Sequence, residues 1–324
     1  MNSLSIFTLK ALRKLYAKTF GEYQLPPLQR EEDPDKASEM IYKLLSGDKP
    51  CMIARFGANE LNAVINYLGV NAKKHSIWQF IQGKQPEWWW NKNIMYNMQN
   101  NAGFFPSTPE NMQRFGEMMI EDAKEVDLLG SWLKQEKLLT HYLISCPKYV
   151  WLDFLIPFLS NNPWSRILQG KKVLVIHPFA ETIRHQYNQR EKLFVNTNVL
   201  PTFQSLNTIK AVQSLGGDNT EFKDWFEALQ WMKDEMDKTD YEICLIGCGA
   251  YGFPLAAHAK RKGKKAIHLG GALQLLFGIR GQRWEDPHLN KDYDISSYMN
   301  DFWVRPSAEE KPQNSENVEN ACYW

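Results

Sequence analysis

Three glycines in the last third of the chain have the spacing of a phosphate-binding loop. Gly247, Gly249 and Gly252 form a G-x-G-x-x-G pattern directly after an apolar run, and Pro254 suits the first turn of a helix that follows. Glycines in such a loop let backbone N–H groups approach an anion at a helix N-terminus. The spacing therefore predicts that the three glycines and Tyr251 contact a nucleotide or another phosphorylated ligand.

The residue that would complete a dinucleotide site is absent. An Asp or Glu that binds the ribose is expected near the end of the second strand, about 20 residues after the glycines. This chain has His268 at that place. The sequence therefore argues against a conventional NAD site, and His268 is a predicted ligand contact instead.

A second group of polar residues follows an apolar run at residues 51–56. Arg55, Gly57, Asn59 and Glu60 lie where this run gives way to a helical pattern. Open α/β sheets place ligand contacts at the carboxyl ends of their strands, so these residues are predicted to bind substrate. The alternative is structural, with Arg55 and Glu60 as a surface ion pair and Asn59 as a helix cap.

A third group follows the apolar run at residues 172–176. His177, Glu181 and His185 recur every fourth residue, and Arg184 lies among them. This spacing is not a zinc-binding HExxH pattern. Arg184 and His185 suit phosphate or sugar hydroxyls, whereas His177 and Glu181, together with Glu60, are the candidates for acid–base catalysis.

Short apolar runs that alternate with helical patterns must position these three groups. Strands are predicted at residues 51–56, 126–129, 172–176, 242–246 and 265–269, with weaker evidence at 142–144. Helices are predicted at residues 36–45, 61–68, 108–123, 152–159, 182–192, 208–215, 221–238, 255–261 and 272–277, and Asp35 is the predicted cap of the first. The pattern predicts an α/β fold, Rossmann-like, with a mostly parallel sheet flanked by helices.

Composition narrows the class of protein. The chain has 324 residues, 44% of them apolar, and a formal net charge of +1, which argues against general nucleic-acid binding. Its five cysteines include no CxxC pair, a pattern typical of a reducing cytoplasm. No run has the length of a membrane-spanning helix. We expect a cytoplasmic protein.

The ends of the chain differ from its middle. Residues 1–34 read as a basic amphipathic helix and a linker arm, residues 35–305 as the α/β domain, and residues 306–324 as a polar tail. Leu9, Leu12, Tyr16 and Phe20 share one face of the first helix, flanked by Lys10, Lys14 and Lys18. This face suits either an anionic membrane surface or packing on the protein's own domain or on a partner.

Two segments resemble the bacterial GT-D glycosyltransferases. Residues 52–60 (MIARFGANE) are similar to the A-R-F-G-D-G-E opening of that family, and residues 244–252 (CLIGCGAYG) resemble its last strand–glycine–helix unit. The resemblance covers residues 35–280. It implies a Rossmann-like domain that transfers sugar from a UDP-sugar to a glycan or lipid-linked acceptor in surface polysaccharide synthesis, usually with Mn²⁺ or Mg²⁺.

One departure from the family concerns the metal. Its D-x-E motif would fall at residues 58–60, where Ala58 replaces the first carboxylate and Glu60 matches the second. Glu60 is therefore the predicted metal ligand. Either Asn59 and an acid from elsewhere in the chain replace the missing carboxylate, or transfer proceeds without metal and depends on Arg55 and Arg184. Two other functions stay open. One is an S-adenosylmethionine-dependent methyltransferase, because residues 246–249 resemble its glycine motif, and the other is a non-catalytic nucleotide-binding accessory protein.

Overall fold

The computed structural model describes residues 2–26, 28–143, 147–214, 221–286 and 293–311. Within these residues, seven strands form one sheet in the order β3-β2-β1-β7-β6-β4-β5, and every neighbouring pair is parallel. The strands are β1 (Cys51–Ala54), β2 (Leu128–Ser131), β3 (Lys148–Trp151), β4 (Lys172–His177), β5 (Ser205–Lys210), β6 (Ile243–Ile246) and β7 (Lys265–His268). The predicted α/β class with a parallel sheet is confirmed.

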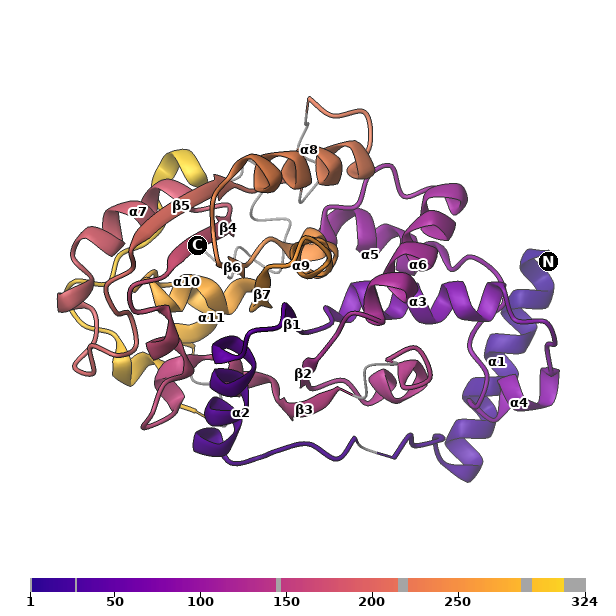
Figure 1. Cartoon of the computed structure of the whole chain (residues 1–324). Helices are drawn as coiled ribbons and strands as arrows, with labels where there is room; N and C mark the ends of the chain where they lie inside the picture. The colour runs from indigo at the N-terminus through magenta and orange to yellow at the C-terminus, as the bar shows by residue number, and fades with distance from the viewer. Residues whose placement is uncertain (1, 27, 144–146, 215–220, 287–292, 312–324) are drawn as a thin grey trace.

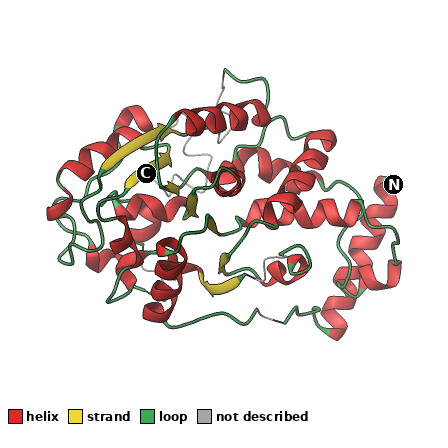
Figure 2. Cartoon of the chain, in the orientation of Figure 1, coloured by secondary structure: helices red, strands yellow, loops and turns green. Residues whose placement is uncertain are grey.

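Helices flank this sheet on both faces (Figures 1 and 2). The α-helices are α1 (Ser3–Phe20), α2 (Pro34–Ser46), α3 (Ala58–Val70), α4 (Ile77–Ile81), α5 (Lys92–Ala102), α6 (Pro109–Ala123), α7 (Ala180–Asn188), α8 (Trp225–Lys238), α9 (Gly252–Arg261), α10 (Leu273–Leu276) and α11 (Gln282–Glu285). No helix in the described ranges is both long enough and apolar enough to cross a membrane.

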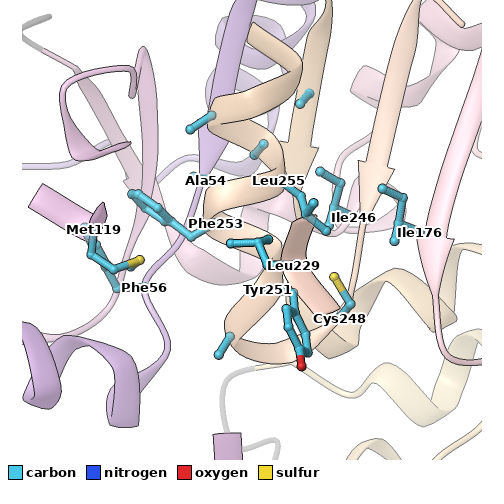
Figure 3. Packing of buried hydrophobic residues seen from close by; sticks show 14 of the residues in the cluster. Ala54, Phe56, Met119, Ile176, Leu229, Ile246, Cys248, Tyr251, Phe253 and Leu255 are labelled. Atoms are coloured by element: carbon cyan, nitrogen blue, oxygen red, sulfur yellow. The ribbon is translucent and has the colours of Figure 1, made fainter. Parts of the chain in front are cut away.

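The core consists of two apolar layers, because alternate strand residues point to opposite faces of the sheet. In β6, Cys244 and Ile246 belong to a cluster with buried residues of α3, α6, α8 and α9, whereas Ile243 and Leu245 belong to a cluster with residues of α2, α7 and α10. Figure 3 shows part of the first layer, in which Phe253 of α9 stacks on Phe56 with ring centroids 4.6 Å apart. This contact joins the two glycine-containing units that were predicted to bind ligand.

The unit at residues 241–271 forms as predicted. β6 leads through Gly247 and the 3₁₀ turn η7 (Gly249–Tyr251) into α9, and β7 follows beside β6. Helix α6 also begins as predicted, with Thr108 as its N-cap. These segments combine a strong apolar period with an unambiguous start or stop signal.

Three local predictions are wrong. Residues 208–215 were expected to be helical, but Thr208, Ile209 and Lys210 belong to β5, which pairs along its length with β4. Asp35 does not cap α2, because Asp33 accepts the cap hydrogen bonds while the Asp35 carboxylate accepts two from Asn161.

The third error concerns residues 152–159. They form two 3₁₀ turns, η2 (Leu152–Leu155) and η3 (Pro157–Leu159), separated at Ile156. Pro157 lacks the N–H that would continue a single helix. The weaker strand at residues 142–144 lies partly outside the described residues, and β3 forms later, at Lys148–Trp151.

Candidate functional site

The seven strands end at one edge of the sheet, and a pocket of about 370 Å³ lies at this edge. The residues after every strand contribute to its lining: Arg55 after β1, Trp132 after β2, Leu152 after β3, Pro178 after β4, Gln213 after β5, Gly247 after β6 and Leu269 after β7. From β1 the chain builds β2 and β3 on one side and then crosses to β4 on the other. Open α/β sheets bind ligands in the crevice at such a reversal.

The three predicted loop glycines have three different roles, and of the three only Gly247 and Gly249 line the pocket. A Cβ on Gly247 would lie 2.5 Å from the Gly270 carbonyl oxygen, so this glycine permits close packing of two loops. Gly249 has φ of +56° and faces open space, since the atom nearest to a Cβ at this position would be the Ala102 oxygen at 3.9 Å. Gly249 is thus the glycine at which a ligand can approach the backbone most closely.

Gly252 and His268 lie behind the pocket rather than in its lining. A Cβ on Gly252 would be 2.1 Å from the His268 ring, so the glycine lets α9 pack directly on the end of β7. Burial, and secondarily the nearby charge of Arg55, lower the pKa of His268 to about 3. The predicted ligand contacts at these two positions are therefore packing contacts.

Arg55 lies at the centre of the pocket edge. Its side chain passes over Gly270, where a Cβ would lie 3.6 Å from the Arg55 Cδ atom, so it spans from β1 to the loop after β7. Its guanidinium carbon is 5.6 Å from the ring centroid of Trp132. The indole N–H of Trp132 donates a hydrogen bond of 2.9 Å to the Phe56 carbonyl, which fixes the ring beside the arginine. Together they offer a cation and an aromatic face to one ligand.

Glu60 and Asn59 both line the pocket, but the Glu60 side chain turns back toward the start of its own helix. A Cβ on Gly57 would lie 1.9 Å from Oε2 of Glu60. A carboxylate in the first turn of α3 is favoured by the partial positive charge at the helix N-terminus. A side chain at position 57 would therefore displace the Glu60 carboxylate from this position, so Gly57 and Glu60 are matched to each other.

The metal expected from the resemblance does not fit these residues well. The acidic side chains in the described lining are Glu60 and Asp153, and the Asp153 carboxylate accepts a hydrogen bond of 3.0 Å from the Trp151 indole. No group of three or more His, Cys, Asp or Glu side chains in the described ranges is arranged to hold a metal ion. Hard divalent cations take six or more oxygen ligands, so Glu60 alone does not make a resident site.

His177 occupies the pocket edge at the end of β4 but is poorly suited to acid–base catalysis. Its Nδ1 atom accepts a hydrogen bond of 3.0 Å from the Phe179 N–H, which places the ring proton on Nε2. Complete burial lowers the pKa of His177 to about 3, so the ring is neutral at pH 7. This geometry provides a neutral N–H donor and does not favour the predicted role of His177 as an acid or base.

Glu181, Arg184 and His185 do not join His177. All three lie on the exposed side of α7 and outside the pocket lining, and Glu181 forms an ion pair with Arg184. Helix α7 begins at Ala180, so the four-residue spacing from His177 to Glu181 is not helical throughout. The predicted roles of these residues in catalysis and substrate binding are therefore not supported by their positions.

The opposite wall of the pocket comes from β5 and α5, and sequence reasoning missed most of it. The Tyr251 ring is buried, stacks on Trp225 at 4.8 Å and brings its hydroxyl within 3.4 Å of the Ser214 hydroxyl. Beside it, the side-chain nitrogen of Gln213 is buried and has no hydrogen-bond partner among the described residues. A buried amide donor that lines a pocket is a ready contact for a ligand oxygen.

The signal that could have located these missed residues is their position just after a strand. Trp132 follows β2 and Gln213 follows β5, as Arg55 follows β1. Gln213 was not recognised because residues 208–215 were predicted to be a helix.

No protein family, curated protein or solved structure matches this chain significantly. The function must therefore be inferred from the pocket itself.

Proposed function

We propose that the protein is a glycosyltransferase that uses a nucleotide diphosphate sugar, most simply a UDP-sugar, and transfers the sugar to a glycan or lipid-linked acceptor. The observation that carries this proposal is the convergence of Arg55, the open backbone at Gly249 and the Trp132 ring on one pocket at the carboxyl edge of the sheet. Its volume of about 370 Å³ is in the usual range for small-molecule sites.

In this proposal the main chemical task is to stabilise the diphosphate as it departs from the sugar. Arg55 would supply a positive charge, and the exposed backbone at Gly249, where a Cβ would meet open space, would let the diphosphate approach closely. The neutral His177 ring and the Gln213 amide add hydrogen-bond donors along the same lining. No step requires a metal held by Glu60.

The end of β7 makes the methyltransferase alternative weaker. Enzymes that bind the adenosine of NAD or S-adenosylmethionine in this kind of fold usually place a carboxylate at the end of the strand after the glycine loop. Here that position holds His268, which is buried under Gly252 and neutral. The described residues offer no acid at this point to bind the ribose hydroxyls.

A nucleotide-binding accessory protein is the second candidate. It is favoured by one specific observation, namely that neither Glu60 nor His177 is placed as a general base, since one turns onto Gly57 and the other accepts a hydrogen bond from Phe179. Such a protein would bind the nucleotide through the same pocket and would leave the donor sugar intact.

Release of UDP from a panel of UDP-sugars separates these two candidates. A glycosyltransferase is expected to release UDP slowly by transfer to water, and Arg55→Ala should abolish this release while Arg184→Ala, outside the pocket, should not. Tight UDP binding without any release from the panel, with or without added acceptor glycans, would favour the accessory protein. Release that persists in Arg55→Ala would contradict the role given to the arginine.

A further inference from the structure

Part of the α1 face for which membrane contact and internal packing were both open packs within the protein. Leu9 is buried in a cluster with Phe80 and Trp89, and the Tyr16 ring meets Trp78 of α4 edge-on at 5.7 Å. Arg13 lies 5.0 Å above the Phe80 ring on the same side. Leu9 and Tyr16 of this face therefore pack on the protein, whereas Leu12 and Phe20 are exposed, and Figure 1 shows α1 and α4 side by side at one end of the molecule.

The opposite face of α1 carries a second apolar row. Leu4, Phe7, Ala11 and Leu15 are spaced by three or four residues and so lie along one side of the helix. Leu4 is 74% exposed, Phe7 71% and Leu15 61%. We call these four residues the outer row, and within the described residues it is covered by no other element.

Another exposed apolar residue lies on the other side of α1. Trp78 of α4 is 59% exposed, but its ring touches Tyr16, which is on the face opposite the outer row. Trp78 is therefore not counted with the outer row.

The charges around the outer row are all positive. The first twenty residues contain Lys10, Arg13, Lys14 and Lys18 and no acidic residue. Lys10 pairs with Glu87, and Arg13 packs on Phe80, whereas Lys14 and Lys18 are exposed. These two lysines lie seven residues after Phe7 and Ala11, so they border the outer row on the helix surface.

We propose that the outer row of α1 docks the protein on an anionic lipid surface. The apolar side chains would enter the boundary between headgroups and acyl chains, while Lys14 and Lys18 would lie among the lipid phosphates. This arrangement is the one found in helices that lie in the plane of a membrane. The inference does not depend on the proposed function, because it uses no residue of the pocket.

A second copy of the chain fits this surface less well. A symmetric dimer uses the same patch on both subunits, so pairing through the outer row would bring the exposed lysines of both copies into one small interface. No acidic residue in α1 is available to neutralise them. Charge complementarity therefore favours an anionic surface as the occupant.

Sedimentation of the full-length protein with lipid vesicles tests the proposal. The probes are vesicles of phosphatidylcholine alone and vesicles that also contain phosphatidylglycerol, at low and high salt. We expect binding only to the second kind, weakened by salt. Phe7→Glu with Leu15→Glu should weaken binding more than tenfold, and Lys14→Gln with Lys18→Gln should weaken it roughly fivefold for each lysine.

The matched control is Val195→Glu with Trp231→Glu, two exposed apolar residues outside α1 and α4. It should bind as the unchanged protein does, and thermal unfolding should show that all variants fold. Failure of the unchanged protein to bind anionic vesicles at low salt would overturn the proposal. So would unchanged binding by the Phe7→Glu/Leu15→Glu variant, or light scattering that shows a dimer which this variant converts to a monomer.

Discussion

At the scale of single residues, the members of two pairs of positions look alike in the sequence but differ in their access to the pocket. Gly249 opens toward the pocket with φ of +56°, whereas Gly252 is filled on its free side by the His268 ring. Arg55 lies inside the pocket, whereas Arg184 lies on the exposed side of α7. Substitutions at these positions therefore test binding without ambiguity, because each has a counterpart outside the pocket.

Gly249→Asn should remove nucleotide binding while the protein stays folded. Asparagine tolerates the left-handed conformation better than other residues with a side chain, and its amide would occupy the open space beside Gly249. Gly263→Asn is the matched control, because Gly263 has φ of +76° with nothing within 4 Å and lies outside the pocket. Calorimetric titration with UDP should show at least about tenfold weaker binding for Gly249→Asn only. Equal affinities would exclude close approach of the ligand at Gly249.

Arg55→Ala should weaken UDP binding roughly ten- to a hundredfold, as expected for loss of a charged hydrogen-bond donor to the diphosphate. Arg184→Ala should leave the affinity unchanged, because its side chain pairs with Glu181 on the surface. The same titration measures both. A loss of affinity in Arg184→Ala equal to that in Arg55→Ala would show that the ligand lies against α7 instead.

The two buried histidines predict how stability depends on pH. The pKa values of His177 and His268 are lowered to about 3 by burial, below the value of 6.5 in an unfolded chain. The unfolded state therefore binds more protons as the pH falls through 6.5, and stability is lost progressively from there toward pH 3. Each histidine should lower the free energy of unfolding by up to about 2 kcal/mol between pH 7 and pH 5.

Urea denaturation at pH 7 and pH 5 checks this expectation. His268→Gln should remove the part of this loss that His268 contributes, up to about 2 kcal/mol between pH 7 and pH 5, whatever its effect on stability at pH 7. His185→Gln, on the exposed side of α7, should leave the dependence as it is. An identical loss of stability in the unchanged protein and in His268→Gln would contradict the assignment of neutral, buried histidines.

At the scale of elements, the sequence predicts best where a local signal and the final packing agree. Residues 243–246 form β6 because a short apolar run with β-branched residues fits a strand buried on both faces, and Gly247 follows it. β5 escaped prediction because it is an edge strand, paired only with β4, and its half-exposed residues lack a continuous apolar run. These residues form a strand because they pair with β4, which lies some thirty residues earlier in the chain. A local sequence pattern does not contain this pairing.

The candidate site shows the same limit. Arg55, Gly249 and His177 could be located from the sequence because each lies at or within three residues of the end of a recognisable strand. The distances between these residues could not be predicted. Neither could the contact of the Glu60 carboxylate with Gly57 or the hydrogen bond from the Phe179 N–H to the His177 ring. These are contacts between side chain and backbone that depend on the orientation of loops, so residue type and spacing alone do not determine them.

The N-terminus of α7 is capped by Glu310, a residue far away in the sequence. The buried Glu310 carboxylate accepts hydrogen bonds from the Glu181 and Thr182 N–H groups, at 2.7 and 3.2 Å, and from the Thr182 hydroxyl. Glu310→Ala should lower the free energy of unfolding by about 2–3 kcal/mol, because it removes a charged acceptor and leaves these donors unpaired. Urea denaturation should show little effect of the neighbouring exposed substitution Glu309→Ala. Equal effects would mean that the cap contributes little.

At the scale of the whole molecule, ligand binding and surface docking are placed on different parts of the chain. The pocket collects residues from the ends of all seven strands, whereas the outer row lies on α1, next to α4 and apart from the sheet (Figure 1). Each property can therefore be removed without the other. The pocket is the feature on which the proposed function depends.

A thermal-shift series with UDP, GDP, S-adenosylmethionine and NAD, each with and without Mn²⁺, tests most directly whether this pocket holds a nucleotide diphosphate. A ligand at a hundred times its dissociation constant stabilises a fold by about 2.7 kcal/mol, which is readily measured. We predict a higher melting temperature with UDP that persists without Mn²⁺ and disappears in Gly249→Asn. A shift with S-adenosylmethionine or NAD alone, or no shift with any of the four ligands, would contradict the proposed function.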